Sequence, residues 1–230
     1  GIYIRKGTCL IKTCKINSNE ANAYASDKRN SKGGGIYLRQ GTAELINTII
    51  SSNSCNGSYS QQGSGIYTYS GTLSLVNSTV AYNNDEGVRN ENGTVSAVNS
   101  IFYNNSGGEI IGTAWIDYSL VKGGFPTGVG IIDDNPRFES ILNLKIRPDS
   151  PCVDAGDSYH MEDLCFCDDH SLASFGTALN DIGAHGGPGA CGWCTTSGGC
   201  CTPQPEGDLD FDGDIDAVDL AIFVGNYGVH

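Results

Sequence analysis

The sequence lacks any long apolar run, and basic residues are few. No stretch of the 230 residues approaches the roughly 18 consecutive apolar residues that a membrane-spanning helix needs. The first half of the chain also lacks the spacing of apolar residues that is typical of helices. Thirteen Lys and Arg stand against 26 Asp and Glu, so the formal net charge is −13. We therefore expect neither a membrane span nor nucleic acid as a partner, because so acidic a protein binds nucleic acid poorly.

A repeated unit dominates the first half of the chain. In its clearest form it begins with Gly-Ile-Tyr, continues with Gly-Thr and closes with Asn followed by Thr or Ser. Three copies begin at Gly1, Gly35 and Gly65, a degenerate fourth begins at Gly87, and a fifth keeps only Gly112-Thr113 and Tyr118-Ser119. An internal repeat of this kind determines the fold before any local propensity does.

Aligning the copies produces three apolar columns. Their members are Ile2, Ile36, Ile66 and Val88; then Ile11, Leu45, Leu75, Ala97 and Ile116; then Ile16, Ile50, Val80, Phe102 and Val121. Each lies in a short alternating stretch bounded by Gly, Asn or Ser, which is typical of a β-strand. Gly65 and Gly87 are 22 residues apart, which suits one turn of a coil that buries its apolar columns by stacking on the next turn. The sequence therefore predicts an all-β fold, a right-handed parallel β-helix (solenoid), with a β-sandwich as the alternative.

The sequence also indicates where the coil bends. Asn47, Asn77 and Asn99 fall where the chain must turn, and Asn tolerates left-handed backbone there. We expect their amides to stack and to hydrogen-bond along the axis. Insertions at 20–32 and 54–63, rich in Asn, Ser, Gly and Gln, are expected to project as loops from one corner.

Three tyrosines alternate with the first apolar column. Tyr3, Tyr37 and Tyr67 should therefore face outward as a stacked strip. Such a strip can bind sugar rings, but the interpretation we favour is a ladder that stabilises neighbouring strands.

Ten cysteines indicate an oxidising, extracellular setting, and hence a secreted protein. The spacing of Cys191 and Cys194 fits a redox pair or half a zinc site. We favour disulfide staples, with connectivity left open, because the adjacent Cys200 and Cys201 suit four-ligand metal geometry poorly. No signal peptide is visible, and the chain opens inside a repeat, so we expect its first residue to be a processed or trimmed edge.

From Tyr118 onward the repeat gives way to four motifs in order. They are Tyr118-Ser119-Leu120-Val121, Asp134-Asn135-Pro136-Arg137-Phe138, the stretch from Ser150-Pro151 to Asp154-Ala155-Gly156, and Asp181-Ile182-Gly183-Ala184. This order resembles the C-terminal end of secreted bacterial parallel β-helix proteins of the choice-of-anchor type, although His185 departs from the aromatic residue usual there. The resemblance implies a C-terminal, Cys-rich cap on a surface or secreted protein, and it implies no reaction.

Catalysis finds little support in the sequence. Lyases and hydrolases that act on pectin share the β-helix, but a fold does not establish a function. A hydrolase would need two carboxylates across a groove. The candidates are Asp133-Asp134, which lie in the cap motif, and Asp168-Asp169-His170, which lie in a Cys-rich insertion. We therefore do not expect an enzyme, although a carboxylate-lined groove on an exposed face of the coil would restore that interpretation.

A strong chemical motif follows Pro203 and Pro205. Carboxylates at loop positions 1, 3, 5, 9 and 12, with Gly213 at position 6, match a calcium-binding loop, and an apolar helix over 220–224 follows. The predicted Ca²⁺ ligands are the side chains of Asp208, Asp210, Asp212, Asp216 and Asp219 and the backbone carbonyl of Asp214. A solvated acidic tail, the alternative, explains neither the glycine nor the helix at these offsets.

This loop-helix calcium motif resembles a dockerin repeat, because Asp219 occupies position 12 and leads directly into Leu220. Dockerins carry two such units and bind cohesin modules, which anchor secreted proteins to a cell surface or scaffold. The resemblance implies a cohesin-like partner, although this chain has one unit only.

These observations divide the chain into coils (1–122), a C-terminal cap of the solenoid (123–190), a Cys/Pro-rich linker (191–206) and the dockerin-like calcium loop and helix (207–230). We expect a secreted, calcium-binding structural or adhesive protein of the cell surface or extracellular space. The alternative is a polysaccharide-binding or polysaccharide-degrading, pectate-lyase-like module. Eight of the 13 basic residues lie in the first 40 positions, so copies are expected to attract one another head to tail, as a ring or filament.

Overall fold

The computed structural model describes residues 1–23, 31–57, 61–157, 179–187 and 190. Its strands form three five-stranded sheets, named A, B and C here, and neighbouring strands in each sheet are parallel. Sheet A contains β1 (Ile2–Ile4), β6 (Ile36–Leu38), β11 (Ile66–Thr68), β14 (Val88–Asn90) and β17 (Ile110–Ile111). Sheet B contains β2 (Thr8–Lys12), β7 (Thr42–Ile46), β12 (Thr72–Val76), β15 (Thr94–Val98) and β18 (Trp115–Asp117). Sheet C contains β3 (Lys15–Asn17), β8 (Ile49–Ser51), β13 (Thr79–Ala81), β16 (Ile101–Tyr103) and β19 (Leu120–Val121).

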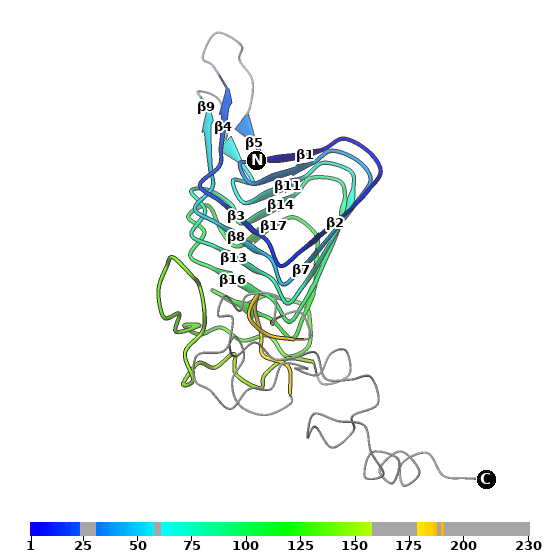
Figure 1. Ribbon diagram of the computed structural model, residues 1–230. Coiled ribbons are helices and arrows are strands. Elements are labelled where there is room, and N and C mark those ends of the chain that lie inside the picture. Colours follow the sequence, from blue (N-terminus) through cyan, green and yellow to red (C-terminus); the bar gives the residue numbers. More distant parts are fainter. Residues whose placement is uncertain (24–30, 58–60, 158–178, 188–189, 191–230) are drawn as a thin grey trace, which may run out of the picture.

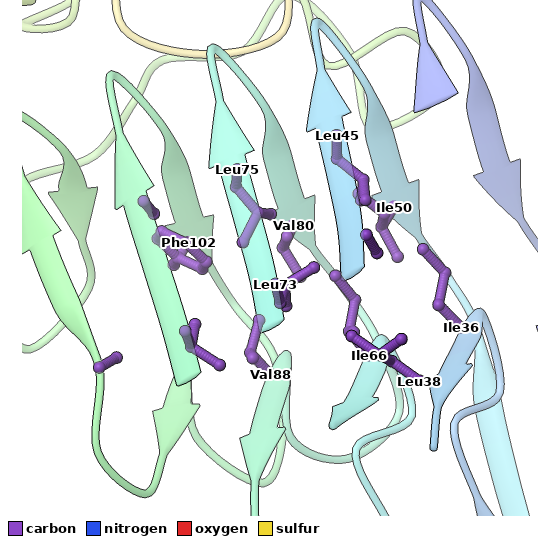
Figure 2. Packing of buried hydrophobic residues seen from close by; sticks show 14 of the residues in the cluster. Ile36, Leu38, Leu45, Ile50, Ile66, Leu73, Leu75, Val80, Val88 and Phe102 are labelled. Atoms are coloured by element: carbon purple, nitrogen blue, oxygen red, sulfur yellow. The ribbon is translucent and has the colours of Figure 1, made fainter. Parts of the chain in front are cut away.

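The chain visits sheets A, B and C in turn and then returns to sheet A one strand further along, which makes the coil seen in Figure 1. This confirms the predicted parallel β-helix, and the sandwich alternative is wrong. The predicted columns are in register: Leu45 pairs with Leu75, and Ile50 pairs with Val80. Figure 2 shows these side chains stacked in rows inside the coil.

Stacking is what buries the apolar columns. Along β7 the side chains of Ala43 and Leu45 point inward and are fully buried, whereas Glu44 between them is exposed. Ile36 has neighbouring coils on both sides and is 0% exposed, but Ile2 in the first coil is 36% exposed. Burying one such side chain completely contributes about 1.5–3 kcal/mol, so each coil stabilises the next.

A buried asparagine ladder lies at the corner between sheets C and A. The Nδ2 of Asn19 donates to Oδ1 of Asn53 at 3.0 Å, Asn53 donates to Asn83 at 3.0 Å, and Asn83 donates to Asn105 at 2.8 Å. The last rung ends on Glu109, whose Oε2 lies 2.5 Å from the Asn105 amide nitrogen. The ladder therefore satisfies the buried amide groups by pairing them along the axis.

The predicted bend asparagines behave differently from the expectation. Asn47, Asn77 and Asn99 do adopt left-handed φ angles, of 47°, 43° and 51°. Their amides do not pair with one another along the axis, however, so that part of the prediction is wrong. Asn77 Nδ2 donates to Oδ1 of Asn180 at 2.7 Å, and Asn47 Nδ2 donates to the carbonyl of Ala184 at 3.1 Å. The left-handed corner turns these side chains outward onto a returning C-terminal segment.

That segment, residues 179–187, is called the strap here. Ile182 of the strap packs with Ile101 and Leu120, and Ala184 packs with Ile49 and Ala81. These partners lie on strands of sheet C but outside the interior cluster, so the strap covers the outer face of that sheet. In the described part of the chain, no such cluster covers the outer faces of sheets A and B.

The predicted insertions project from the corner between sheets C and A (Figure 1). They are not plain loops, however. β4 (Glu20–Ala23) pairs with β9 (Ser54–Gly57), and β5 (Ser31–Lys32) pairs with β10 (Gln61–Gln62), both in parallel. Successive insertions thus repeat the pairing of the coils that carry them, which the polar composition concealed.

Candidate functional site

Several predicted site residues lie outside the described residues. These are the calcium ligands Asp208, Asp210, Asp212, Asp214, Asp216 and Asp219, the Asp168-Asp169-His170 group, and Cys165, Cys167, Cys191, Cys194, Cys200 and Cys201. The calcium loop therefore stays a prediction from the sequence. Within the ranges that the structure describes, no three His, Cys, Asp or Glu side chains are grouped so as to hold a metal ion.

The four described cysteines do not serve as staples. Cys9, Cys14, Cys55 and Cys152 are free thiols. Burial raises the pKa of the Cys152 thiol to about 12, so this group is held in its protonated, unreactive form. The expected disulfides are therefore wrong for these four residues and stay a prediction for the other six.

The tyrosine strip lies on the outer face of sheet A, as predicted. Ring centroids are 5.2 Å apart both between Tyr3 and Tyr37 and between Tyr37 and Tyr67. Tyr3 is 54% exposed, but Tyr67 is 0% exposed, because Lys32 from the projecting insertion places its Nζ 4.3 Å from the Tyr67 ring centroid. Burial raises the pKa of the Tyr67 hydroxyl well above its ordinary value. A strip so closely packed agrees with a ladder that joins strands.

A charged cluster continues beyond the strip, and sequence reasoning missed it. Arg89 is in register with Tyr67, and its Nη1 lies 2.7 Å from Oε1 of Glu86. Glu86 is buried and also accepts the Gly63 N–H at 2.6 Å. Burial and the neighbouring Glu86 raise the pKa of the Asp85 carboxyl to about 6. The third coil lacks an insertion, so these side chains fill the corner where the other two coils carry one.

A groove of about 270 Å³ lies on the outer face of sheet B, towards the later coils. The polar and aromatic residues that line it are Ser74, Ser96, Trp115, Asp117, Tyr118 and Asp157. Ser74, Ser96 and Trp115 are in register on β12, β15 and β18, so they form one row across three coils. Trp115 is 61% exposed. The groove thus joins a broad apolar ring to hydroxyl and carboxylate groups.

Hydrogen bonds hold two of the residues that line the groove, Asp117 through its side chain and Asp157 through its backbone. Asp117 Oδ1 accepts the Val129 N–H at 2.8 Å. The backbone N–H of Asp157 donates to Oδ1 of Asn99 at 2.7 Å. Tyr118 takes a left-handed φ of 44° at the corner where earlier coils place Asn47, Asn77 and Asn99. These contacts place an aromatic corner and two carboxylates beside the sheet.

The predicted Asp133-Asp134 pair does not line this groove. Asp133 Oδ1 accepts the Gly123 N–H at 2.8 Å, and Asp134 Oδ1 accepts the Asn135 N–H at 2.6 Å. Both aspartates are exposed, and these bonds shape turns. This agrees with their assignment to the cap motif.

The residues that the structure describes include no helix with the length and apolar character to cross a membrane. Comparison with models of protein families, with curated proteins and with solved structures finds no match. The resemblances to choice-of-anchor proteins and to dockerins therefore rest on the sequence motifs alone.

Proposed function

We propose that this chain is an extracellular, right-handed β-helix with a structural or adhesive role at a surface. The observation that carries the proposal is the pair of polar ladders that holds successive coils in one register, while no described hydrophobic cluster covers the outer faces of sheets A and B. Right-handedness is expected because crossovers between parallel strands are almost always right-handed. Such a solenoid offers an extended, rigid surface to a partner.

The second ladder consists of hydroxyl groups inside the bend between sheets B and C. Oγ of Ser78 accepts the Thr48 N–H at 3.3 Å, Ser100 accepts the Ser78 N–H at 3.2 Å, and Ser119 accepts the Ser100 N–H at 3.1 Å. All four side chains are fully buried. Together with the asparagine ladder, this row supports rigidity, because every rung repeats between coils and none depends on a flexible surface contact.

Adhesion is tested by retention on insoluble material. The purified chain is mixed with insoluble glucans, mannans, xylans and peptidoglycan, and the protein left in solution is measured. The folded chain should be retained on at least one material, and the heat-unfolded chain should not, because adhesion depends on the ordered faces. If the folded chain is retained on none of them, the adhesive role is wrong.

We also propose that the C-terminal loop binds Ca²⁺ through the residues that the sequence indicates and so supplies an anchoring element. The support is the spacing of its carboxylates around Gly213. Calcium titration calorimetry should detect about one site, and replacing Asp208 and Asp219 with Ala should abolish it. Unchanged binding in that variant would show that the ligands are elsewhere. A cohesin-like partner for the loop follows only if the site binds calcium.

Polysaccharide binding is the second candidate function, and the groove on sheet B favours it. An exposed indole beside hydroxyl and carboxylate groups suits a ligand that has both an apolar face and a polar edge.

A further inference from the structure

We propose that the groove on the outer face of sheet B binds a neutral saccharide chain, with Trp115 as the surface on which a sugar ring stacks. The inference rests on the second candidate function and specifies its site and its ligand class. The site lies where the outward row of sheet B departs from the repeat.

Trp115 interrupts the pattern of its row. The outward positions of sheet B that pair in register are Leu10, Glu44, Ser74, Ser96 and Trp115. Two small side chains are thus followed by the largest one, and this step in size leaves the hollow beside the indole. An indole that is 61% exposed keeps much of its apolar area in water, so a ligand that covers it gains hydrophobic energy.

The chemistry of the lining matches a sugar ring. A pyranose has a face of C–H groups, which stacks on an aromatic plane, and an edge of hydroxyl groups, which donate and accept hydrogen bonds. The indole of Trp115 supplies the plane, Ser74 and Ser96 supply hydroxyls, and Asp117 supplies a carboxylate acceptor. Neighbouring strands are about 4.8 Å apart, so the row repeats at a spacing comparable to one sugar unit.

The negative charge of the groove favours neutral polysaccharides over anionic ones. The groove contains the carboxylates of Asp117 and Asp157, and none of the described residues that line it is Lys, Arg or His. The whole chain carries a net charge of −13. A polymer of uronic acids would be repelled by this field, because like charges without a paired cation are unfavourable. A neutral glucan, mannan or xylan meets no such penalty.

We assign binding rather than catalysis to the groove, although its lining includes two carboxylates, Asp117 and Asp157. Glycoside hydrolysis needs one carboxyl group that donates a proton and a second that acts as nucleophile or base. Asp117 Oδ1 is already an acceptor for the Val129 N–H at 2.8 Å, which suits a fixed carboxylate that receives hydrogen bonds from sugar hydroxyls. The proposal is therefore one of binding without bond cleavage, and an assay for reducing ends tests it.

Tryptophan fluorescence measures this binding directly. The chain has two tryptophans, so the titration uses a Trp193→Phe background in which Trp115 is the reporter. Hexasaccharides of glucose, mannose and xylose are the neutral probes, and oligogalacturonate is the anionic probe. We expect a saturable spectral shift with at least one neutral probe and no shift with oligogalacturonate.

Trp115→Ala, made in the otherwise unchanged chain and followed by calorimetry with the same probe, should weaken binding at least about tenfold, because stacking aromatics dominate such sites. Trp115→Phe should retain part of the affinity. Leu10→Ala is the matched control: Leu10 lies in the same row on β2, is 53% exposed and does not line the groove, so its loss should leave affinity unchanged. Circular dichroism confirms that each variant is folded.

The inference is overturned if Trp115→Ala binds as tightly as the parent chain, if oligogalacturonate binds as well as the neutral probes, or if reducing ends accumulate. The retention assay separates this failure from failure of the adhesive role. A Trp115→Ala chain that stays on the insoluble material shows that adhesion is real but uses another face. A parent chain that is not retained on the insoluble material, yet binds a hexasaccharide through Trp115, shows that the saccharide site is real and that the adhesive role is wrong.

Discussion

Replacing Asn83 with Ala should be among the most damaging single changes in the coil. The side chain is buried at the centre of the asparagine ladder and makes four hydrogen bonds. Its Oδ1 accepts the backbone N–H and the Nδ2 of Asn53, both at 3.0 Å. Its Nδ2 donates to Oδ1 of Asn105 at 2.8 Å and to the carbonyl of Ile50 at 3.1 Å.

The size of the stability loss follows from the hydrogen-bonding groups that Asn83→Ala would leave without a partner. Asn105 Oδ1 keeps the backbone N–H of residue 83, at 3.0 Å, so its loss is small. Two donors of Asn53 and the carbonyl of Ile50 lose a partner inside the coil. Each such group costs about 1–3 kcal/mol, so the loss of all three should lower the free energy of unfolding by about 3–9 kcal/mol. For a chain of this size, at about 2–4 °C per kcal/mol, that corresponds to a loss of at least roughly 6 °C and up to roughly 36 °C in melting temperature.

Asn84→Ala is the control, because it makes the same chemical change one residue away. Asn84 is exposed, and its backbone N–H donates to the Asn53 carbonyl at 2.9 Å, a bond that Ala keeps. Thermal unfolding followed by circular dichroism should separate the two variants clearly, with Asn84→Ala within about 0.5 kcal/mol of the parent chain. Equal melting temperatures would refute the view that the ladder is a main source of stability.

Three further predictions concern close packing, pH and assembly. Gly65→Ala should lower the denaturation midpoint, because a Cβ there would lie 2.3 Å from the Gly87 carbonyl oxygen and 3.0 Å from Nδ2 of Asn83; an unchanged midpoint would contradict this packing. Burial lowers the pKa of His185 from 6.5 to about 4, so His185 stabilises the fold above pH 6.5 and loses this contribution as pH falls towards 4. The raised pKa of Asp85 has the opposite sign, so the test compares pH–stability curves of the parent chain and His185→Asn, and identical curves would exclude the effect. Because basic residues concentrate in the first coils, light scattering should show growth of assemblies at low salt and high concentration, and a strictly monomeric chain would end the head-to-tail proposal.

The sequence was sufficient to predict the coil and its register. Ile66 pairs with Ile36, and Leu75 with Leu45, as the alignment of repeats requires, because an interior seen by every coil imposes the same periodicity on each. The asparagine ladder was present in the same alignment but was not recognised. Its members Asn19, Asn53, Asn83 and Asn105 each follow the glycine of the Gly-Thr element by 12 residues, directly before the point where insertions begin.

Contacts between residues far apart in the sequence are the second part of the structure that the sequence did not reveal. Asn77 and Asn180 are 103 positions apart, and nothing local in either segment indicates their hydrogen bond. The groove has the same origin, since Trp115, Ser96 and Ser74 belong to different coils and Asp157 approaches from outside them. One signal was present in the sequence: an alignment of the outward positions shows Trp115 after the two serines, Ser74 and Ser96.

The strap is a segment of fixed length that is bonded to several coils, so it limits the number of coils that can lie beneath it. It meets three successive corners, through Gly183 N–H to the Asn99 carbonyl at 2.8 Å, Asn180 to Asn77, and Ala184 to Asn47. Duplicating a coil between Asn47 and Asn99 would move those corners apart by about 4.8 Å, while the strap would keep its length. Repeat proteins commonly change size by gaining or losing units, but here such a change would break at least one corner contact. Growth by duplication is thereby confined to coils that the strap does not reach.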